Sequence, residues 1–220
     1  MTGTDDLIRA IVADARPVRR LASPFRRAAA WLGFAVILVT VVALSFGLRD
    51  DLAAKLSEPL FVLELVAIGL TGVTASVAAF CVSLPDRSRA WLLLPTPAVV
   101  VWLSTIGYAC LTNWISLGPA GPAAGISLRC FATATLTSVP LAAVLLRMLR
   151  HAGTTRPIET AMAGALAIAA LTTGGLRFFH NLDPTIIVLG WTFGTTLTFT
   201  ALGGLFGRRM FIWAGRRQPC

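Results

Sequence analysis

The chain has 220 residues, of which 56% are hydrophobic and only 13% are charged, and its net charge is +9. An ordinary soluble domain is about 45–50% apolar and about 25% charged, so this chain has too few charges to cover a water-facing surface. Its basic charge leaves two classes open, a membrane protein or a nucleic-acid binder, and the positions of the charges must decide between them.

The first 27 residues are largely polar and are predicted to contain one short helix over residues 4–15. Thr4 or Asp5 can cap its N-terminus, and Pro17 prevents its continuation. A helix of this length is marginal by itself in water, so its apolar face must be buried against lipid, the rest of the chain or another protein. That face follows helical spacing and consists of Leu7, Ile8, Ile11, Val12 and Ala15.

Two kinds of surface can cover this apolar face. It can lie at the lipid interface, with Arg16, Arg19 and Arg20 on the headgroups. It can equally dock as a helix in a groove of a soluble protein. Asp14 and the other acidic residues of the segment slightly favour a protein, because an anionic membrane surface repels them.

Long stretches with few or no charges follow, and each can cross a bilayer, which needs about 20 apolar residues for about 30 Å of hydrocarbon. In residues 28–48 only Thr40 and Ser45 interrupt the apolar side chains, so the polar face of a soluble surface helix is missing. A cleaved signal peptide is not expected, because this first span is long and follows a polar segment. The predicted fold is all-α, a six-transmembrane-helix bundle. Its spans are 28–48, 60–84, 90–112, 127–149, 157–179 and 184–206.

The positive charges lie mostly on one side of these spans. Fifteen of the 19 fall in the N-terminal segment, in the links near residues 87 and 150, and in the C-terminal tail. By the positive-inside rule, both the N and C termini are then cytoplasmic, and the net charge of +9 becomes an orientation signal that requires no direct nucleic-acid contact. The predicted domains are a cytoplasmic segment (1–27), the six-helix transmembrane domain (28–207) and a basic cytoplasmic tail (208–220).

Several reactive or ionisable residues are predicted near the outer ends of the spans. Cys110 and Cys130 lie where an oxidising periplasm permits a disulfide, although two unpaired thiols explain them as well. Glu64 lies about one turn inside the second span, where a carboxylate is costly and usually paired. Arg129 and Arg177 have a comparable depth and are the candidate partners. For any single member of this group, an ordinary structural ion pair or interfacial residue is a sufficient explanation.

Short motifs spread over nearly the whole chain add a second kind of observation. They include Asp6-Leu7-Ile8, Pro17-Val18-Arg19-Arg20-Leu21, Pro85-Asp86-Arg87-Ser88-Arg89, Ser127-Leu128-Arg129-Cys130 and Gly207-Arg208-Arg209. On these motifs the chain resembles the NrsF-like family, six-helix bacterial membrane proteins that act as anti-sigma factors for extracytoplasmic-function sigma factors. The resemblance implies that residues 1–27 hold such a sigma factor inactive at the inner membrane until a stress signal releases it.

The resemblance also implies a pair of cysteines linked to stress sensing. Cys130 matches one of them, whereas the other is expected near residue 180, where this chain has His180. Either Cys110 replaces the missing thiol, or His180 joins Cys130 as a ligand for a soft metal. These residues form no recognised metal spacing, so no metal site is assigned. The predicted sensing group is Glu64, Cys110, Arg129, Cys130, Arg177 and His180.

Motifs of catalysis are missing from the sequence: it has no phosphate-binding glycine loop, nucleophile elbow or HExxH. The sequence therefore predicts no enzyme and no cofactor. The alternative function is a small multi-pass transporter or channel, which the scarcity of polar residues in the spans disfavours. The predicted partners are an extracytoplasmic-function sigma factor and the lipid bilayer. The predicted partner-binding residues are Leu7, Ile8, Ile11, Val12, Asp14, Arg16, Pro17, Arg19 and Arg20.

Overall fold

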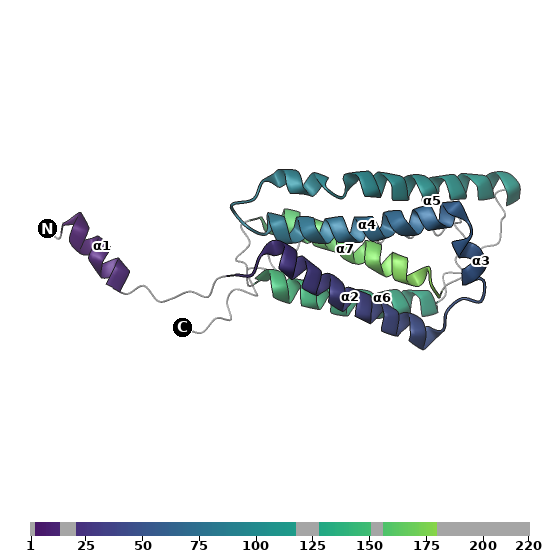
Figure 1. Ribbon diagram of the computed structural model, residues 1–220, viewed down its shortest axis with the longest axis horizontal. Helices are drawn as coiled ribbons and strands as arrows, with labels where there is room; N and C mark the ends of the chain where they lie inside the picture. The colour runs from purple at the N-terminus through teal and green to yellow at the C-terminus, as the bar shows by residue number, and fades with distance from the viewer. Residues whose placement is uncertain (1–2, 14–20, 118–127, 151–155, 180–220) are drawn as a thin grey trace.

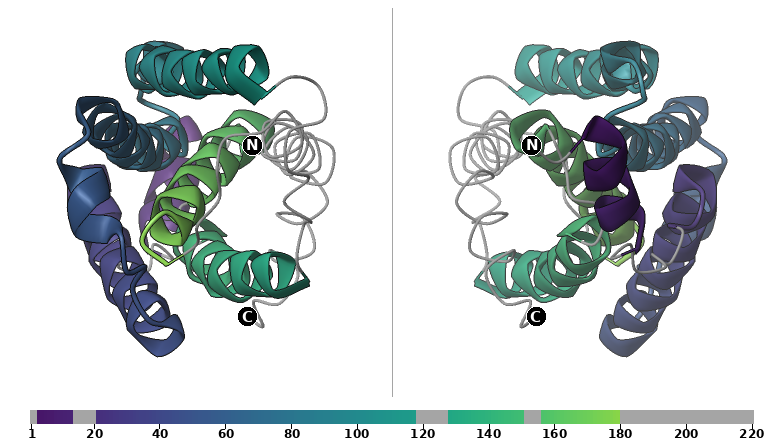
Figure 2. Two further views of the ribbon diagram at one scale, coloured as in Figure 1. Left: turned by 90° about the vertical axis from the view of Figure 1, so that its right-hand side faces the viewer. Right: turned by 90° about the vertical axis from the view of Figure 1, so that its left-hand side faces the viewer.

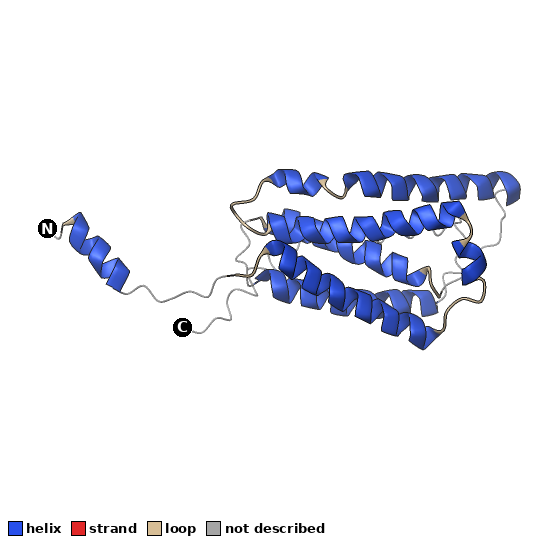
Figure 3. Cartoon of the chain, in the orientation of Figure 1, coloured by secondary structure: helices blue, strands red, loops and turns tan. Residues whose placement is uncertain are grey.

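The computed structural model describes residues 3–13, 21–117, 128–150 and 156–179 (Figure 1). All regular elements in this part of the chain are helices, and no strand occurs in it (Figure 3). In chain order the elements are α1 (Thr4–Ala13), α2 (Pro24–Phe46), α3 (Leu52–Leu56), α4 (Pro59–Val82), the 3-10 helix η1 (Arg89–Leu93), α5 (Thr96–Leu117), α6 (Leu128–Arg150) and α7 (Pro157–Leu176).

The prediction of an all-α fold is confirmed for the described residues, and the first five predicted spans correspond to long helices within a few residues. Five segments are long and apolar enough to cross a membrane. The third span differs most, because Pro95 separates η1 from α5 instead of lying inside one helix. The short helix α3 was not predicted. The helix predicted over residues 4–15 is confirmed for Thr4–Ala13, and its last two predicted residues lie outside the described residues. The sixth predicted span, residues 184–206, lies outside the described residues.

The ends of α2 follow directly from its sequence. The Ser23 hydroxyl accepts a hydrogen bond from the Arg26 backbone N–H at 3.4 Å, and Pro24 occupies the first helical position, where no N–H is needed. Gly47 ends the helix with a φ of 81°, a conformation that other residues rarely adopt. The helix α2 therefore begins at Pro24, four residues before the predicted first span at residue 28.

The helices α4 and α7 pack against each other along most of their length and form the centre of the bundle (Figure 2). Their facing positions carry small residues, which let the two backbones approach closely. Gly72 illustrates this: a Cβ atom there would lie 2.7 Å from Leu171 Cδ2. The other small buried residues of these two helices include Ala67, Ala75, Ala79, Ala163, Ala167, Ala170 and Gly174.

We expect Gly72→Leu to lower the free energy of unfolding by about 1–3 kcal/mol relative to Gly69→Leu, because overpacking forces α4 and α7 apart. Gly69 is a matched control, since it lies one turn away on the same helix and a Cβ there meets nothing within 4 Å. Thermal unfolding of the two purified variants in the same detergent measures the difference. Equal stability of the two variants would contradict the close α4–α7 contact.

The outer surface of the bundle is strongly apolar. Val36, Ile37, Val41 and Leu44 of α2 are all exposed, as are four large aliphatic side chains of α4 between residues 63 and 73. Water-facing surfaces of soluble proteins rarely carry apolar patches of this extent. The exposed aliphatic surface, together with the lengths of the helices, indicates a membrane protein.

Candidate functional site

The two ends of the bundle differ in charge. We call the end where α2, α5 and α7 begin and where α4 and α6 finish the basic end (Figure 1). Its described part holds seven arginines and two carboxylates, whereas the opposite end holds four positive and four negative residues. The basic-end residues are Arg26, Arg27, Arg87, Arg89, Arg147, Arg150 and Arg156, with Asp86 and Glu159.

The helix α1 lies clear of the bundle on the side of the basic end (Figure 1). Its first turn contains Asp5 and Asp6, whose charges favour a helix N-terminus, and the Asp6 backbone N–H donates to the Gly3 carbonyl at 3.0 Å. Ile8 and Val12, four residues apart on one face, are 52% and 67% exposed. Two large aliphatic side chains in adjacent turns are therefore left for another surface to cover.

The structure covers only part of the predicted partner-binding set. Leu7 and Ile11 lie in α1, but their side chains are outside the described structure. The remaining members, Asp14, Arg16, Pro17, Arg19 and Arg20, lie outside the described residues. The contribution of these residues to partner binding stays a prediction.

Near the opposite end of the bundle, Glu64 of α4 forms an ion pair with Arg177, which directly follows α7. Their side chains are only 12% and 13% exposed. Arg177 is one of the two predicted candidates, and the side chain of the other, Arg129, is not described. Because a buried charge is stable only with a partner, this contact ties α4 to the end of α7 among otherwise apolar side chains.

Residues next to Arg177 connect the same corner to the end of α2. The Arg49 backbone N–H donates to the Phe178 carbonyl at 3.1 Å. The rings of Phe46 and Phe179 stack with their centroids 5.7 Å apart. The end of α7 is therefore held by α4 through an ion pair, by the last residue of α2 through a ring contact, and by the segment after α2 through a backbone hydrogen bond.

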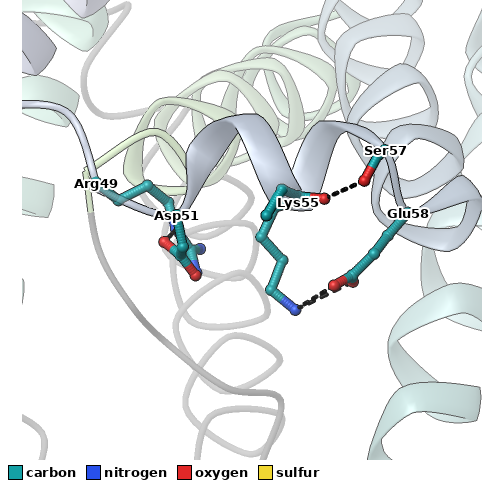
Figure 4. A network of polar contacts seen from close by, with 6 residues as sticks. Arg49, Asp51, Lys55, Ser57 and Glu58 are labelled. Atoms are coloured by element: carbon teal, nitrogen blue, oxygen red, sulfur yellow. Dashed lines mark hydrogen bonds and ion pairs between the residues drawn. The ribbon is translucent and has the colours of Figure 1, made fainter.

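A second polar network surrounds α3 (Figure 4). Arg49 donates to both carboxylate oxygens of Asp51, at 2.5 and 2.6 Å, and this hydrogen bonding lowers the pKa of the exposed Asp51 carboxyl. Lys55 forms an ion pair with Glu58 at 2.9 Å, and the Ser57 hydroxyl donates to the Ala54 carbonyl. These short-range contacts fold the link between α2 and α4 into a compact corner.

The other members of the predicted sensing group are placed only by their helices or not at all. Cys110 lies in the second half of α5, and Arg129 and Cys130 lie in the first turn of α6, but the side chains of these three are not described. His180 lies outside the described residues. Within the described ranges, no three His, Cys, Asp or Glu side chains form a group that could hold a metal ion.

Comparison with known proteins identifies the chain. The family model described as negative regulator of sigma F, NrsF, matches residues 11–213. The chain belongs to the NrsF family. The resemblance inferred from the motifs is therefore confirmed, and a negative regulator of sigma F implies a sigma factor as the partner. No curated protein and no solved structure matches the chain.

In this NrsF-family protein, sequence reasoning missed one buried residue at the basic end. Arg27 was counted with the cytoplasmic charges, but it lies in the first turn of α2 and is only 7% exposed. The signal that could have located it is its spacing from Trp31: an arginine one helical turn before a buried tryptophan shares that residue's face. Trp31 is fully buried, and its indole Nε1–H donates to the Leu141 carbonyl of α6 at 3.2 Å.

Proposed function

We propose that this NrsF-family protein is a multi-pass protein of the bacterial inner membrane that holds an extracytoplasmic-function sigma factor through its cytoplasmic segment, residues 1–27. An envelope, redox or metal stress signal releases the sigma factor. The observation that carries this proposal is α1, a helix that lies clear of the bundle (Figure 1) and whose Ile8 and Val12 side chains are largely exposed. Family membership supports a sigma factor as the occupant of that face.

The charge difference between the two ends of the bundle supports the proposed orientation. The basic end has an excess of arginines over carboxylates, and the positive-inside rule assigns such an end to the cytoplasm. The segment 1–27 enters the bundle at this end and would therefore face the compartment where sigma factors act. In the proposed complex, the apolar face of α1 supplies the contact area, and Arg16, Arg19 and Arg20 add charge complementarity.

The proposed sensing region lies at the opposite end of the bundle. A stress signal acting there, with Cys130 as the first candidate for the residue that senses it, would change helix packing. This change would weaken the binding of the sigma factor by the N-terminal segment. Such a change requires two bundle states that differ in their affinity for the sigma factor. The transporter alternative gains no support, because Glu64, a carboxylate inside the second span, is paired with Arg177.

Deletion of residues 2–20 tests the proposed function. This deletion keeps Ser23 and Pro24, which begin α2, so the bundle can still fold. With a candidate extracytoplasmic-function sigma factor coexpressed, we expect the full chain to recruit it to the membrane fraction and the deletion variant to lose at least about 90% of that recruitment, since two exposed apolar anchors are removed. Fractionation and immunoblotting measure both.

As a control, residues 1–23 are fused to an unrelated transmembrane helix, which should retain recruitment. Full recruitment by the deletion variant would refute docking through the N-terminal segment. The absence of recruitment by the full chain, with every candidate sigma factor of the same genome, would refute the proposed function itself.

A further inference from the structure

Arg27 makes the most unusual polar contact at the basic end of the bundle. Its guanidinium leaves the first turn of α2, donates through Nη2 to the Met148 carbonyl of α6, and lies 5.0 Å above the ring of Phe80 in α4. One side chain therefore joins three helices. It does so at the last residue of the segment 1–27 that is proposed to hold the sigma factor.

The chemistry of both contacts explains why a charged group is retained in this buried place. Met148 lies in the last turn of α6, where backbone carbonyls have no helical donor and the helix dipole favours a positive charge. The Phe80 ring attracts the cation through its negative face. The guanidinium thus caps the C-terminal end of α6, and the Phe80 ring of α4 packs against the guanidinium.

Trp31 repeats the connection one turn further along α2. Its Nε1–H donates to the Leu141 carbonyl, so α2 donates from two successive turns to the backbone of α6. Arg27 and Trp31 together fix how α2 lies on α6. Because α2 is one continuous helix from Pro24, they also fix the position at which the N-terminal segment joins the bundle.

We infer that Arg27 is a positioning residue that couples the packing of the opposite end of the bundle to the N-terminal segment; the inference rests on the proposed function. Arg27 contacts α4 and α6. Near their other ends, α4 carries Glu64 and α6 carries Cys130. A shift of either helix along its axis moves Phe80 or the Met148 carbonyl and so pulls on the first turn of α2. Rigid helices with two packing arrangements can carry such coupling over this length.

The test is a double-mutant cycle in the full chain, reconstituted in nanodiscs, with affinity for the coexpressed sigma factor as the readout. The opposite end is perturbed by replacing both partners of its ion pair, Glu64→Met with Arg177→Met, which removes the contact without leaving an unpaired buried charge. The basic end is perturbed by Arg27→Met, which keeps an unbranched apolar stem but loses the cap. Arg26→Met is the matched control, because it removes one positive charge from a neighbouring exposed residue.

We expect the methionine pair to change sigma-factor affinity about tenfold in the wild-type and Arg26→Met backgrounds, a typical size for coupling between distant sites. In the Arg27→Met background the same pair should change affinity less than about twofold. Phe80→Leu should uncouple in the same way, which provides a second variant if Arg27→Met fails to fold.

An equal effect of the methionine pair in all backgrounds, or no effect in the wild type, would overturn the coupling role and leave Arg27 a structural cap only. Neither result would contradict the proposed function. That function instead fails if the wild-type chain binds no sigma factor, or if it binds equally well without residues 2–20.

Discussion

Glu64→Gln is expected to lower the free energy of unfolding by about 3–5 kcal/mol, because Arg177 keeps its charge in a largely buried position after losing its carboxylate. An exposed ion pair would contribute well under 1 kcal/mol, so the size of the loss reports the burial of this pair. Denaturant or thermal unfolding of the purified chain in detergent measures it.

Two further variants separate the ion pair from a general loss of packing. Replacing both residues by methionine should cost much less stability than Glu64→Gln, because both charges of the buried pair are removed together. Exchanging the charges, Glu64→Arg with Arg177→Glu, should recover part of the loss. If Glu64→Gln is as stable as the wild type, the carboxylate does not stabilise Arg177, and the proposed link between α4 and α7 at this end is wrong.

The limits of the spans could be predicted from sequence because charged residues mark them for a physical reason. A charged side chain is expelled from hydrocarbon, so Arg49, Arg87 and Arg150 mark the limits of helices without any knowledge of packing. The same argument placed Glu64 and Arg177 at one depth. It could not choose between Arg177 and Arg129, because depth along a helix says nothing about rotation around its axis.

Short elements and buried cations escaped prediction for a different reason. The five residues of α3 are held by side-chain contacts such as Arg49 with Asp51, which no apolar periodicity reveals. The separate 3-10 turn η1 before Pro95, which packs against α4, was not predicted. In the sequence, Arg27 is indistinguishable from the arginines that set the orientation, because its partners, the Phe80 ring and the Met148 carbonyl, lie more than 50 residues away in the chain.

The double variant Ile8→Asp with Val12→Asp is expected to weaken sigma-factor binding about a hundredfold or more. Each side chain is largely exposed and presents an apolar anchor on one face of α1, and truncating such anchors at an interface costs about 2 kcal/mol or more each. A carboxylate in their place also adds an unpaired charge to the contact. Pull-down of the sigma factor by the full chain in nanodiscs measures the change.

Ala13→Asp is the matched control, since it adds the same charge one residue beyond Val12, about 100° around the helix and away from the apolar face. We expect it to change affinity by less than about threefold. The comparison also decides between the two surfaces that the sequence left open for α1. If the apolar face lies on lipid, the double variant releases α1 from vesicles and leaves sigma-factor binding unchanged; if a protein groove covers the face, binding is lost while the bundle stays folded.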